Sequence, residues 1–301
     1  MTVAFCGLHL GHPIVNGSGT FDAIAARRAF GDALLEHFPF AAFVSKTITL
    51  EPRQGNPPPR LYETPAGLIN SIGLPNKGLR GYLDADLPEL ARLPVPLITN
   101  VMGSTAEELC TLVEALDDRD EVAALELNVS CPNVHTGLDI GADPVELAAV
   151  LRAVRPRTNK PLIVKLTPNT ADVGAAAQAA EDTGANAVSL INTLRAYAPH
   201  PERTGVPWLG NATGGLSGPA IRAVALAQVR EVAARVAIPV VGMGGVQTGV
   251  HAARMLEVGA TLVAVGTESF RDPAAGTRIS RELDVFFAKS GDNIRRVHTG
   301  A

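Results

Sequence analysis

Short apolar runs alternate with longer amphipathic segments along most of the chain. The runs are rich in Val, Ile and Leu, and each lies next to a segment in which Ala, Leu, Glu and Arg recur with helical period. This alternation is typical of βα units that build a parallel sheet. It predicts strands at about 13–17, 42–47, 96–101, 123–128, 161–166, 186–191, 238–243 and 261–266. It predicts helices at about 24–37, 105–118, 143–156, 170–183, 219–236, 248–257 and 273–289.

Eight parallel strands are the number that closes a (β/α)8 TIM barrel. We therefore expect an α/β protein in which residues 1–301 form a single barrel domain. Residues 2–10 are expected to form a short N-terminal hairpin below the barrel. Two connections, 48–82 and 192–218, are far longer than an ordinary βα loop, so we expect them to be long active-site loops.

Composition and charge exclude several classes of protein. Hydrophobic residues make up 46% of the chain and charged residues 19%, which predicts a globular protein with a sizeable core. A formal net charge of -4 gives no attraction for nucleic acid or for anionic membranes. No segment approaches the roughly 20 apolar residues of a membrane span, and the N-terminus has no basic, then apolar, leader. We expect a cytoplasmic protein.

The three cysteines, Cys6, Cys110 and Cys131, are scattered and form no Cys-x-x-Cys pair. Disulfide frameworks, zinc sites and iron–sulfur clusters need closely spaced cysteines. The sequence therefore predicts no metal site in this chain. Any iron–sulfur chemistry would have to come from another chain.

Polar residues and glycines gather where the predicted strands end. In a TIM barrel the carboxyl ends of the strands form the active-site face. Any one of these residues alone is more typical of a turn cap, but together they indicate a site. They are Asn16-Gly17-Ser18-Gly19, Ser45-Lys46-Thr47, Thr99-Asn100, Asn128, Lys165-Leu166-Thr167, Asn192-Thr193, Gly242-Met243-Gly244-Gly245 and Gly266-Thr267.

Glycine pairs follow the last two predicted strands, where barrels commonly bind phosphate through backbone amides. The alternative is tight-turn chemistry, and the pattern is not the GxGxxG of a dinucleotide-binding domain. We choose Gly244, Gly245, Gly266 and Thr267 as the phosphate donors.

Two lysines, Lys46 and Lys165, end strands whose preceding residues are apolar, so both ammonium groups are expected to point into the mouth of the barrel. A buried ammonium needs an anion nearby. A phosphorylated cofactor and an anionic substrate satisfy both lysines. The alternative is that one lysine only pairs with a carboxylate of the chain.

Cys131 lies just after the fourth strand in "LELNVSCPNVHTG" (125–137), at the start of a loop to Asp143 that could act as a lid. Buried cysteines are commonly inert small hydrophobes, but Cys131 stands among Asn128, Ser130 and Asn133. A thiol there could act as a nucleophile or as a general base. With no partner histidine in the motif, the position favours a general base that works near its own pKa.

The sequence resembles the class 1 dihydroorotate dehydrogenases, FMN-containing barrels of pyrimidine biosynthesis, nearly from end to end. The stretches that carry the resemblance are "NGSGTF" (16–21), "SKTITLEPRQGNPPPRLYET" (45–64), "NSIGLPN" (70–76), "NVSCPNV" (128–134), "VKLTPN" (164–169), "LINT" (190–193), "GGLSGPA" (214–220), "GMGG" (242–245) and "AVGT" (264–267).

This resemblance implies oxidation of dihydroorotate to orotate, with FMN as hydride acceptor and Cys131 as the base that removes the C5 proton. It implies FMN contacts from Ser18, Lys46, Thr47, Asn100, Asn128, Lys165, Ile191, Gly218, Gly244, Gly245, Gly266 and Thr267. It implies substrate contacts from Lys46, Asn70, Ser71, Ile72, Gly73, Leu74, Asn128, Asn192 and Thr193.

Two stretches, "TITLEPR" and "CPNVHTGLDIGADP", resemble subclass B rather than the fumarate-using subclass A. Subclass B implies a homodimer that pairs with an iron–sulfur flavoprotein, which carries FAD and the cluster and passes electrons to NAD⁺. The segment "LRAYAPHPERTGVPW" (194–208) departs from the family, because Arg195 and His200 are unexpected there.

Three alternatives remain open. A related flavin barrel acting on dihydrouracil would share the cysteine, but Lys46 favours a substrate with a carboxylate. A flavin-free isomerase or lyase could bind a phosphorylated metabolite at the same glycines and would be colourless. A non-catalytic barrel could serve as a binding subunit.

Overall fold

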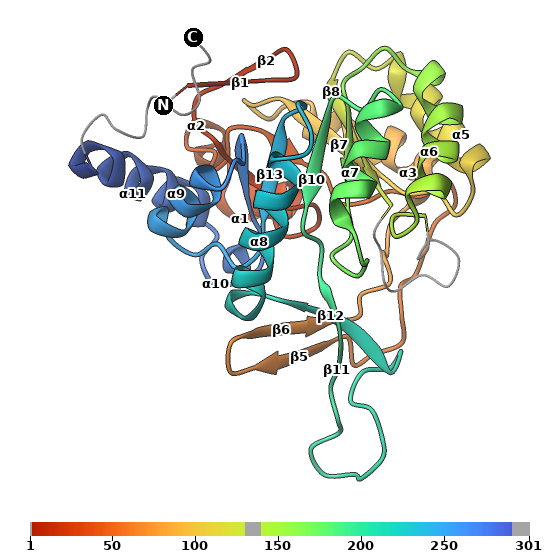
Figure 1. The fold of residues 1–301 in the computed structure, drawn as a ribbon, viewed down its shortest axis with the longest axis vertical. Helices are drawn as coiled ribbons and strands as arrows, with labels where there is room; N and C mark the ends of the chain where they lie inside the picture. Colours follow the sequence, from red (N-terminus) through yellow and green to blue (C-terminus); the bar gives the residue numbers. More distant parts are fainter. Residues whose placement is uncertain (1, 130–139, 291–301) are drawn as a thin grey trace.

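The computed structural model describes residues 2–129 and 140–290. Its centre is an eight-stranded parallel sheet in the order β3-β14-β13-β10-β9-β8-β7-β4 (Figure 1). All eight predicted strands are confirmed. They are β3 (Ile14–Asn16), β4 (Phe43–Val44), β7 (Leu97–Val101), β8 (Val122–Asn128), β9 (Leu162–Lys165), β10 (Ala187–Leu190), β13 (Val240–Met243) and β14 (Leu262–Val265).

Helices follow the strands as the sequence predicts, with one correction. The predicted helix over 24–37 is two helices, because Gly31 ends the first at φ 64°, a left-handed conformation that favours glycine. The helices of the βα units are α1 (Ala23–Phe30), α2 (Ala33–Glu36), α5 (Ala106–Asp117), α6 (Pro144–Val154), α7 (Val173–Asp182), α8 (Arg222–Ala233), α9 (Gly249–Glu257) and α11 (Ala275–Ser290). Within the described residues, no helix is long and apolar enough to cross a membrane.

Several short helical turns complete the structure, and two of them, at 155–157 and 219–221, overlap predicted helices. The chain from 78 to 90 winds through α3 (Gly78–Gly81), the π-helical η1 (Tyr82–Asp86) and α4 (Leu87–Leu90), all inside or just after a stretch that the sequence predicts as loop. The others are η2 (Arg155–Arg157), η3 (Pro219–Ile221) and α10 (Glu268–Arg271). Buried Tyr82 anchors the first of these segments by a 2.8 Å hydrogen bond to Thr99 of β7.

Alternate residues of each strand divide the core in two, since successive strand side chains point to opposite faces. Val15, Ile98, Ala124 and Ile163 belong to one buried cluster inside the barrel, and their sequence neighbours pack outward under the helices. The predicted hairpin is confirmed as β1 (Val3–Phe5) and β2 (Leu8–Leu10), which lies at the end of the barrel away from the small sheet (Figure 1). Its buried Phe5 and Leu10 join the inner cluster, so the hairpin closes this end.

Asn16 joins the two ends of the eight-stranded order. Its side-chain Nδ2 donates to the carbonyl of Val44 at 2.8 Å, and its Oδ1 accepts from the amide of Val44 at 2.8 Å. A backbone hydrogen bond adds to this link, because the amide of Ala41, just before β4, donates to the carbonyl of Ile14 in β3 at 2.9 Å. The carboxamide thus takes the place of a backbone pair between β3 and β4, and the sheet becomes a closed ring.

The two long connections, 48–82 and 192–218, contain short strands of their own. They fold together into a four-stranded antiparallel sheet in the order β11-β12-β6-β5, seen below the barrel in Figure 1. Strands β6 and β12 come from different connections and pair through residues such as Asn70 and Gly215. A hairpin signal marks only strands that are adjacent in the chain, so the sequence of either connection does not predict this pairing. The strands are β5 (Leu61–Thr64), β6 (Gly67–Asn70), β11 (Leu194–Tyr197) and β12 (Thr213–Ser217).

We predict that Asn16→Leu lowers the free energy of unfolding by about 2–4 kcal/mol, because it leaves the buried amide and carbonyl of Val44 without partners. Urea unfolding followed by circular dichroism measures the change. The control is Asn159→Leu at an exposed position, which should shift the midpoint little. Equal midpoints for both variants would show that Asn16 does not close the barrel.

Candidate active site

Asn100 and Lys165, two of the polar residues predicted at the strand ends, share one face of the sheet. Ile98, Ala124 and Ile163 point into the barrel, so Asn100, Glu126 and Lys165, each two residues later, point into it one layer higher. Asn100 is fully buried and Lys165 is 6% exposed. The barrel interior is therefore apolar near the hairpin and polar near the opposite mouth.

Glu126 organises this polar layer, although the sequence analysis did not single it out. Its Oε2 accepts from Asn100 Nδ2 at 2.5 Å and its Oε1 accepts from Ser189 Oγ at 2.7 Å. A sequence signal was present, since Glu126 interrupts an apolar strand two residues before Asn128 and so shares its face. A buried carboxylate inside a strand is rare enough to be informative.

The bond to Glu126 fixes the orientation of the Asn100 carboxamide. Because Nδ2 donates to the carboxylate, Oδ1 must face the other way. This Oδ1 is buried, and no donor from the described part of the chain reaches it. Buried acceptors are nearly always paired, so the site offers an acceptor for an N–H group of a bound molecule.

A second cluster joins the ends of three strands. Ser18 Oγ donates to the carbonyl of Ser45 at 2.8 Å and lies 3.4 Å from Thr47 Oγ1. Asn128 Nδ2 donates to the same Thr47 hydroxyl at 3.4 Å. Three predicted cofactor contacts, Ser18, Thr47 and Asn128, are thus side by side.

The two predicted lysines lie at the same mouth. Lys165 ends β9 and is buried as predicted, whereas Lys46 follows β4 and is an exposed residue, so the expectation that both lysines are buried is wrong for Lys46. Among residues 2–129 and 140–290, no carboxylate lies within ion-pair distance of either ammonium. Loss of water around the Lys46 ammonium lowers its pKa, and this effect outweighs the opposing charge of Asp22. Both cations therefore remain available to an anionic ligand.

Glycines line the rim after β12, β13 and β14. Gly245 has φ 68°, and a Cβ there would come within 2.8 Å of the carbonyl oxygen of Gly218, so a side chain is excluded. Gly266 differs, because a Cβ there would meet only Thr20, at 3.8 Å. A Cβ at Gly266 would thus make only an ordinary van der Waals contact. Ile191, a predicted contact after β10, packs beside Gly244, and Thr267 Oγ1 donates to Ser217 Oγ at 2.8 Å.

The predicted substrate loop, residues 70–74, follows β6 of the small sheet. Asn56 Nδ2 donates to Ser71 Oγ at 2.9 Å, and Asn70 Nδ2 donates to the carbonyl of Gly215 at 3.2 Å. Gly73 has φ 74°, and any side chain there would collide with the backbone of Asn56. Within the same loop, Ile72 and Leu74 are partly buried.

The small sheet brings the substrate loop beside the end of β10. Asn192 and Thr193 follow that strand, and the Thr193 amide donates to Asn192 Oδ1 at 2.9 Å. Thr193 packs so closely on Gly215 of β12 that a Cβ on the glycine would overlap it. Gly215 pairs with Asn70, so Asn70 and Thr193 contact the same residue from two sides.

The remaining predictions fall elsewhere. Cys131 lies outside the described residues. Arg195 is an exposed residue of β11, and the His200 ring lies 5.4 Å from Trp208 in the loop that follows. The described residues hold no cluster of His, Cys, Asp and Glu that could bind a metal ion.

Comparison with known proteins gives similarity over nearly the whole chain. A family model described as "Dihydroorotate dehydrogenase" matches residues 1–287. A protein of Geobacter sp. (strain M21), named "Dihydroorotate dehydrogenase B (NAD(+)), catalytic subunit", is 45% identical over 290 residues, 96% of this chain and 93% of the relative. A protein of the same name from Desulforudis audaxviator is 44% identical over 293 residues, 96% of this chain and 93% of the relative. A third protein of this name, from Geobacter sulfurreducens, is 42% identical over 295 residues, 97% of this chain and 94% of the relative.

We predict that Glu126→Leu lowers the free energy of unfolding of the flavin-free chain by about 2–4 kcal/mol. The substitution leaves the buried Asn100 amide and Ser189 hydroxyl without the acceptor that Glu126 provides. Glu126→Gln should lose less, because a carboxamide can accept from Asn100 while the Ser189 hydroxyl rotates to accept from it. Urea midpoints compare the two. If both variants unfold at the same midpoint, Glu126 does not organise the layer.

Proposed function

The chain belongs to the dihydroorotate dehydrogenase family, and on that premise we propose that it oxidises dihydroorotate to orotate with FMN bound in the mouth of the barrel. The observation that carries the proposal is the inward-facing layer of Asn100, Glu126 and Lys165. It presents a buried unpaired acceptor and a buried cation to one ligand. The reaction belongs to pyrimidine biosynthesis, which we place in the cytoplasm.

The residues around the mouth fit a phosphorylated flavin. Asn100 Oδ1 can accept from a ring N–H, and the buried Lys165 ammonium can balance negative charge on the ring. The phosphate would be held by backbone amides at Gly244, Gly245, Gly266 and Thr267. Bound FMN would supply the two-electron acceptor for the oxidation. Further contacts would come from Ser18, Lys46, Thr47, Asn128, Ile191 and Gly218.

The residues nearer the small sheet fit a pyrimidine. Carboxamides of Asn70, Asn128 and Asn192 can match its alternating amide donors and acceptors, and Lys46 can pair with its carboxylate. Ser71, Ile72, Gly73, Leu74 and Thr193 complete this side of the site. Cys131 would act as general base and take the proton from C5.

A second chain is needed to pass the electrons on. The relatives are named as catalytic subunits of an enzyme that uses NAD⁺, which implies a separate electron-transfer subunit. We propose that this partner carries FAD and an iron–sulfur cluster and that the chain forms a homodimer. Anaerobic reduction of NAD⁺ should then require the partner, whereas artificial dyes should accept electrons from this chain alone.

We predict that the purified chain carries one FMN and that dihydroorotate bleaches it under anaerobic conditions. Lys165→Ala should weaken FMN retention or slow bleaching, because it removes the buried cation of the site. Lys160→Ala, placed before β9 at the other end of the barrel, is the matched control. Absorbance at the flavin bands measures both. Folded, colourless wild-type protein that takes up no FMN would refute the proposal. Bleaching by dihydrouracil in preference to dihydroorotate would show that dihydrouracil is the substrate.

We predict that Cys131→Ser slows bleaching by about 10²–10⁴-fold near neutral pH, because a serine hydroxyl is a far weaker acid than a thiol of pKa about 8.5. The rate of the variant should keep rising with pH, whereas the wild-type rate should level off once the thiolate forms. Stopped-flow bleaching across a pH series measures this. A wild-type rate and pH profile in the variant would mean that Cys131 is not the base.

A further inference from the structure

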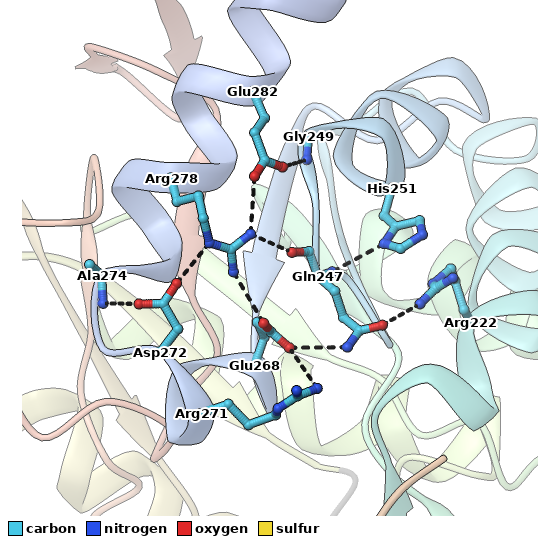
Figure 2. A network of polar contacts seen from close by, with 10 residues as sticks. All are labelled: Arg222, Gln247, Gly249, His251, Glu268, Arg271, Asp272, Ala274, Arg278 and Glu282. Atoms are coloured by element: carbon cyan, nitrogen blue, oxygen red, sulfur yellow. Dashed lines mark hydrogen bonds and ion pairs between the residues drawn. The ribbon is translucent and has the colours of Figure 1, made fainter. Parts of the chain in front are cut away.

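Behind the glycine loops after β13 and β14 lies a network of charged and amide side chains (Figure 2). It joins the start of α8, the β13–α9 loop, α10 and α11. None of its members is among the residues predicted to contact flavin or substrate. The network nevertheless links the loops that would bind the phosphate.

Arg222, the first residue of α8, ties the Gly218 turn to the β13 loop. Its Nε donates to the carbonyl of Gly245 at 2.8 Å, and its Nη2 donates to Gln247 Oε1 at 2.9 Å. The hydrogen bond from Arg222 restrains the Gly245–Val246 peptide group at its carbonyl oxygen, on the side opposite its N–H group. Arg222 therefore fixes the direction of one proposed phosphate-binding segment.

Gln247 links this segment to the loop after β14. Its Nε2 donates to Glu268 Oε2 at 3.1 Å, while its Oε1 accepts from Arg222. Because each end of the carboxamide has one matching partner, its orientation is determined. Glu268 directly follows Thr267 and begins α10, so a single side chain couples the two glycine loops.

Arg278 of α11 supports the link from behind. Its Nη2 donates to Glu268 Oε1 at 3.1 Å and its Nη1 to the carbonyl of Gln247 at 3.0 Å. It also pairs with Asp272 at 2.8 Å and with Glu282 at 3.2 Å. The Glu268 side chain is only 11% exposed. Isolated surface ion pairs contribute little, but a shielded, shared network holds its members in one geometry.

We infer that Gln247, Glu268 and Arg278 are positioning residues that hold the two glycine loops at the spacing required by the phosphate of the cofactor. This inference rests on the proposed function, since it assumes that the loops bind FMN. The network acts through the backbone of Gly245 and Thr267 and not by contact with the flavin ring. Its loss should therefore reduce affinity for the phosphate while leaving affinity for the ring unchanged.

Riboflavin, which lacks the phosphate, separates these two contributions. The flavin-free chain and its variants are titrated with FMN and with riboflavin, and quenching of flavin fluorescence gives both dissociation constants. In the wild type, FMN should bind more tightly. Gln247→Leu should weaken FMN binding by about tenfold, the loss of one good hydrogen bond in free-energy terms, and leave riboflavin binding within about twofold.

A donor–acceptor exchange tests the link itself. Gln247→Glu keeps the acceptor for Arg222 but sets two carboxylates against each other, so it should lose FMN preference as Gln247→Leu does. Adding Glu268→Gln restores a donor between the two positions and should recover most of the preference. Arg254→Met is the control, because Arg254 pairs with Glu257 on α9 outside the network.

The outcomes are distinct. A wild type that binds no FMN refutes the proposed function, and the inference with it. A wild type that binds FMN and riboflavin equally shows that these loops hold no phosphate. FMN preference that survives Gln247→Leu, or FMN and riboflavin affinities that fall in the same proportion, overturns the inference and leaves the network a support of the fold. Selective loss of FMN, with rescue by the double exchange, establishes it.

Discussion

Two hydrogen bonds between the Asn16 carboxamide and the backbone of Val44 join the ends of the eight-stranded sheet. A parallel sheet that closes on itself sends all its carboxyl ends to one rim. Residues from distant parts of the chain, such as Ser18 and Asn128, then contact the same Thr47 hydroxyl. Without closure, β3 and β4 would be the edges of an open sheet, and the strand ends would form a line and not a ring around the mouth.

The interior of this ring changes character along its axis. Near the hairpin it is filled by Phe5, Val15 and Ile163, which need no partners beyond each other. One layer higher it contains Glu126 and Lys165, whose burial is costly unless each charge is satisfied. Glu126 is satisfied by Asn100 and Ser189, whereas among the described residues Asn100 Oδ1 has no donor and Lys165 has no carboxylate partner. This difference is the basis for proposing the mouth as the binding site, whereas the opposite end is apolar core.

The proposed site is supported from two sides, by the small antiparallel sheet and by side chains of the barrel's outer helices. The small antiparallel sheet sets Asn70 and Thr193 against Gly215. The network around Gln247 sits behind the glycine loops on another side. The small sheet depends on a close contact at Gly215, where glycine permits an approach that other residues would prevent. The network depends on side-chain hydrogen bonds. The barrel supplies the positions of the strand ends, and these supports fix the loops that leave them.

Local pattern alone determined the eight strands, most of the helices and the polar character of the strand ends, because period and apolar runs are properties of neighbouring residues. The same pattern placed Lys46, Asn100 and Lys165 at one rim, since a barrel leaves them no other place. It missed the pairing of β6 with β12, the role of Glu126 and the Gln247 network. Each of these depends on which distant residue lies opposite, as Asn70 does to Gly215. The sequence by itself thus determined which residues face the mouth, and only the tertiary structure decided their partners, because hydrogen bonds form between atoms that folding, and not chain order, brings together.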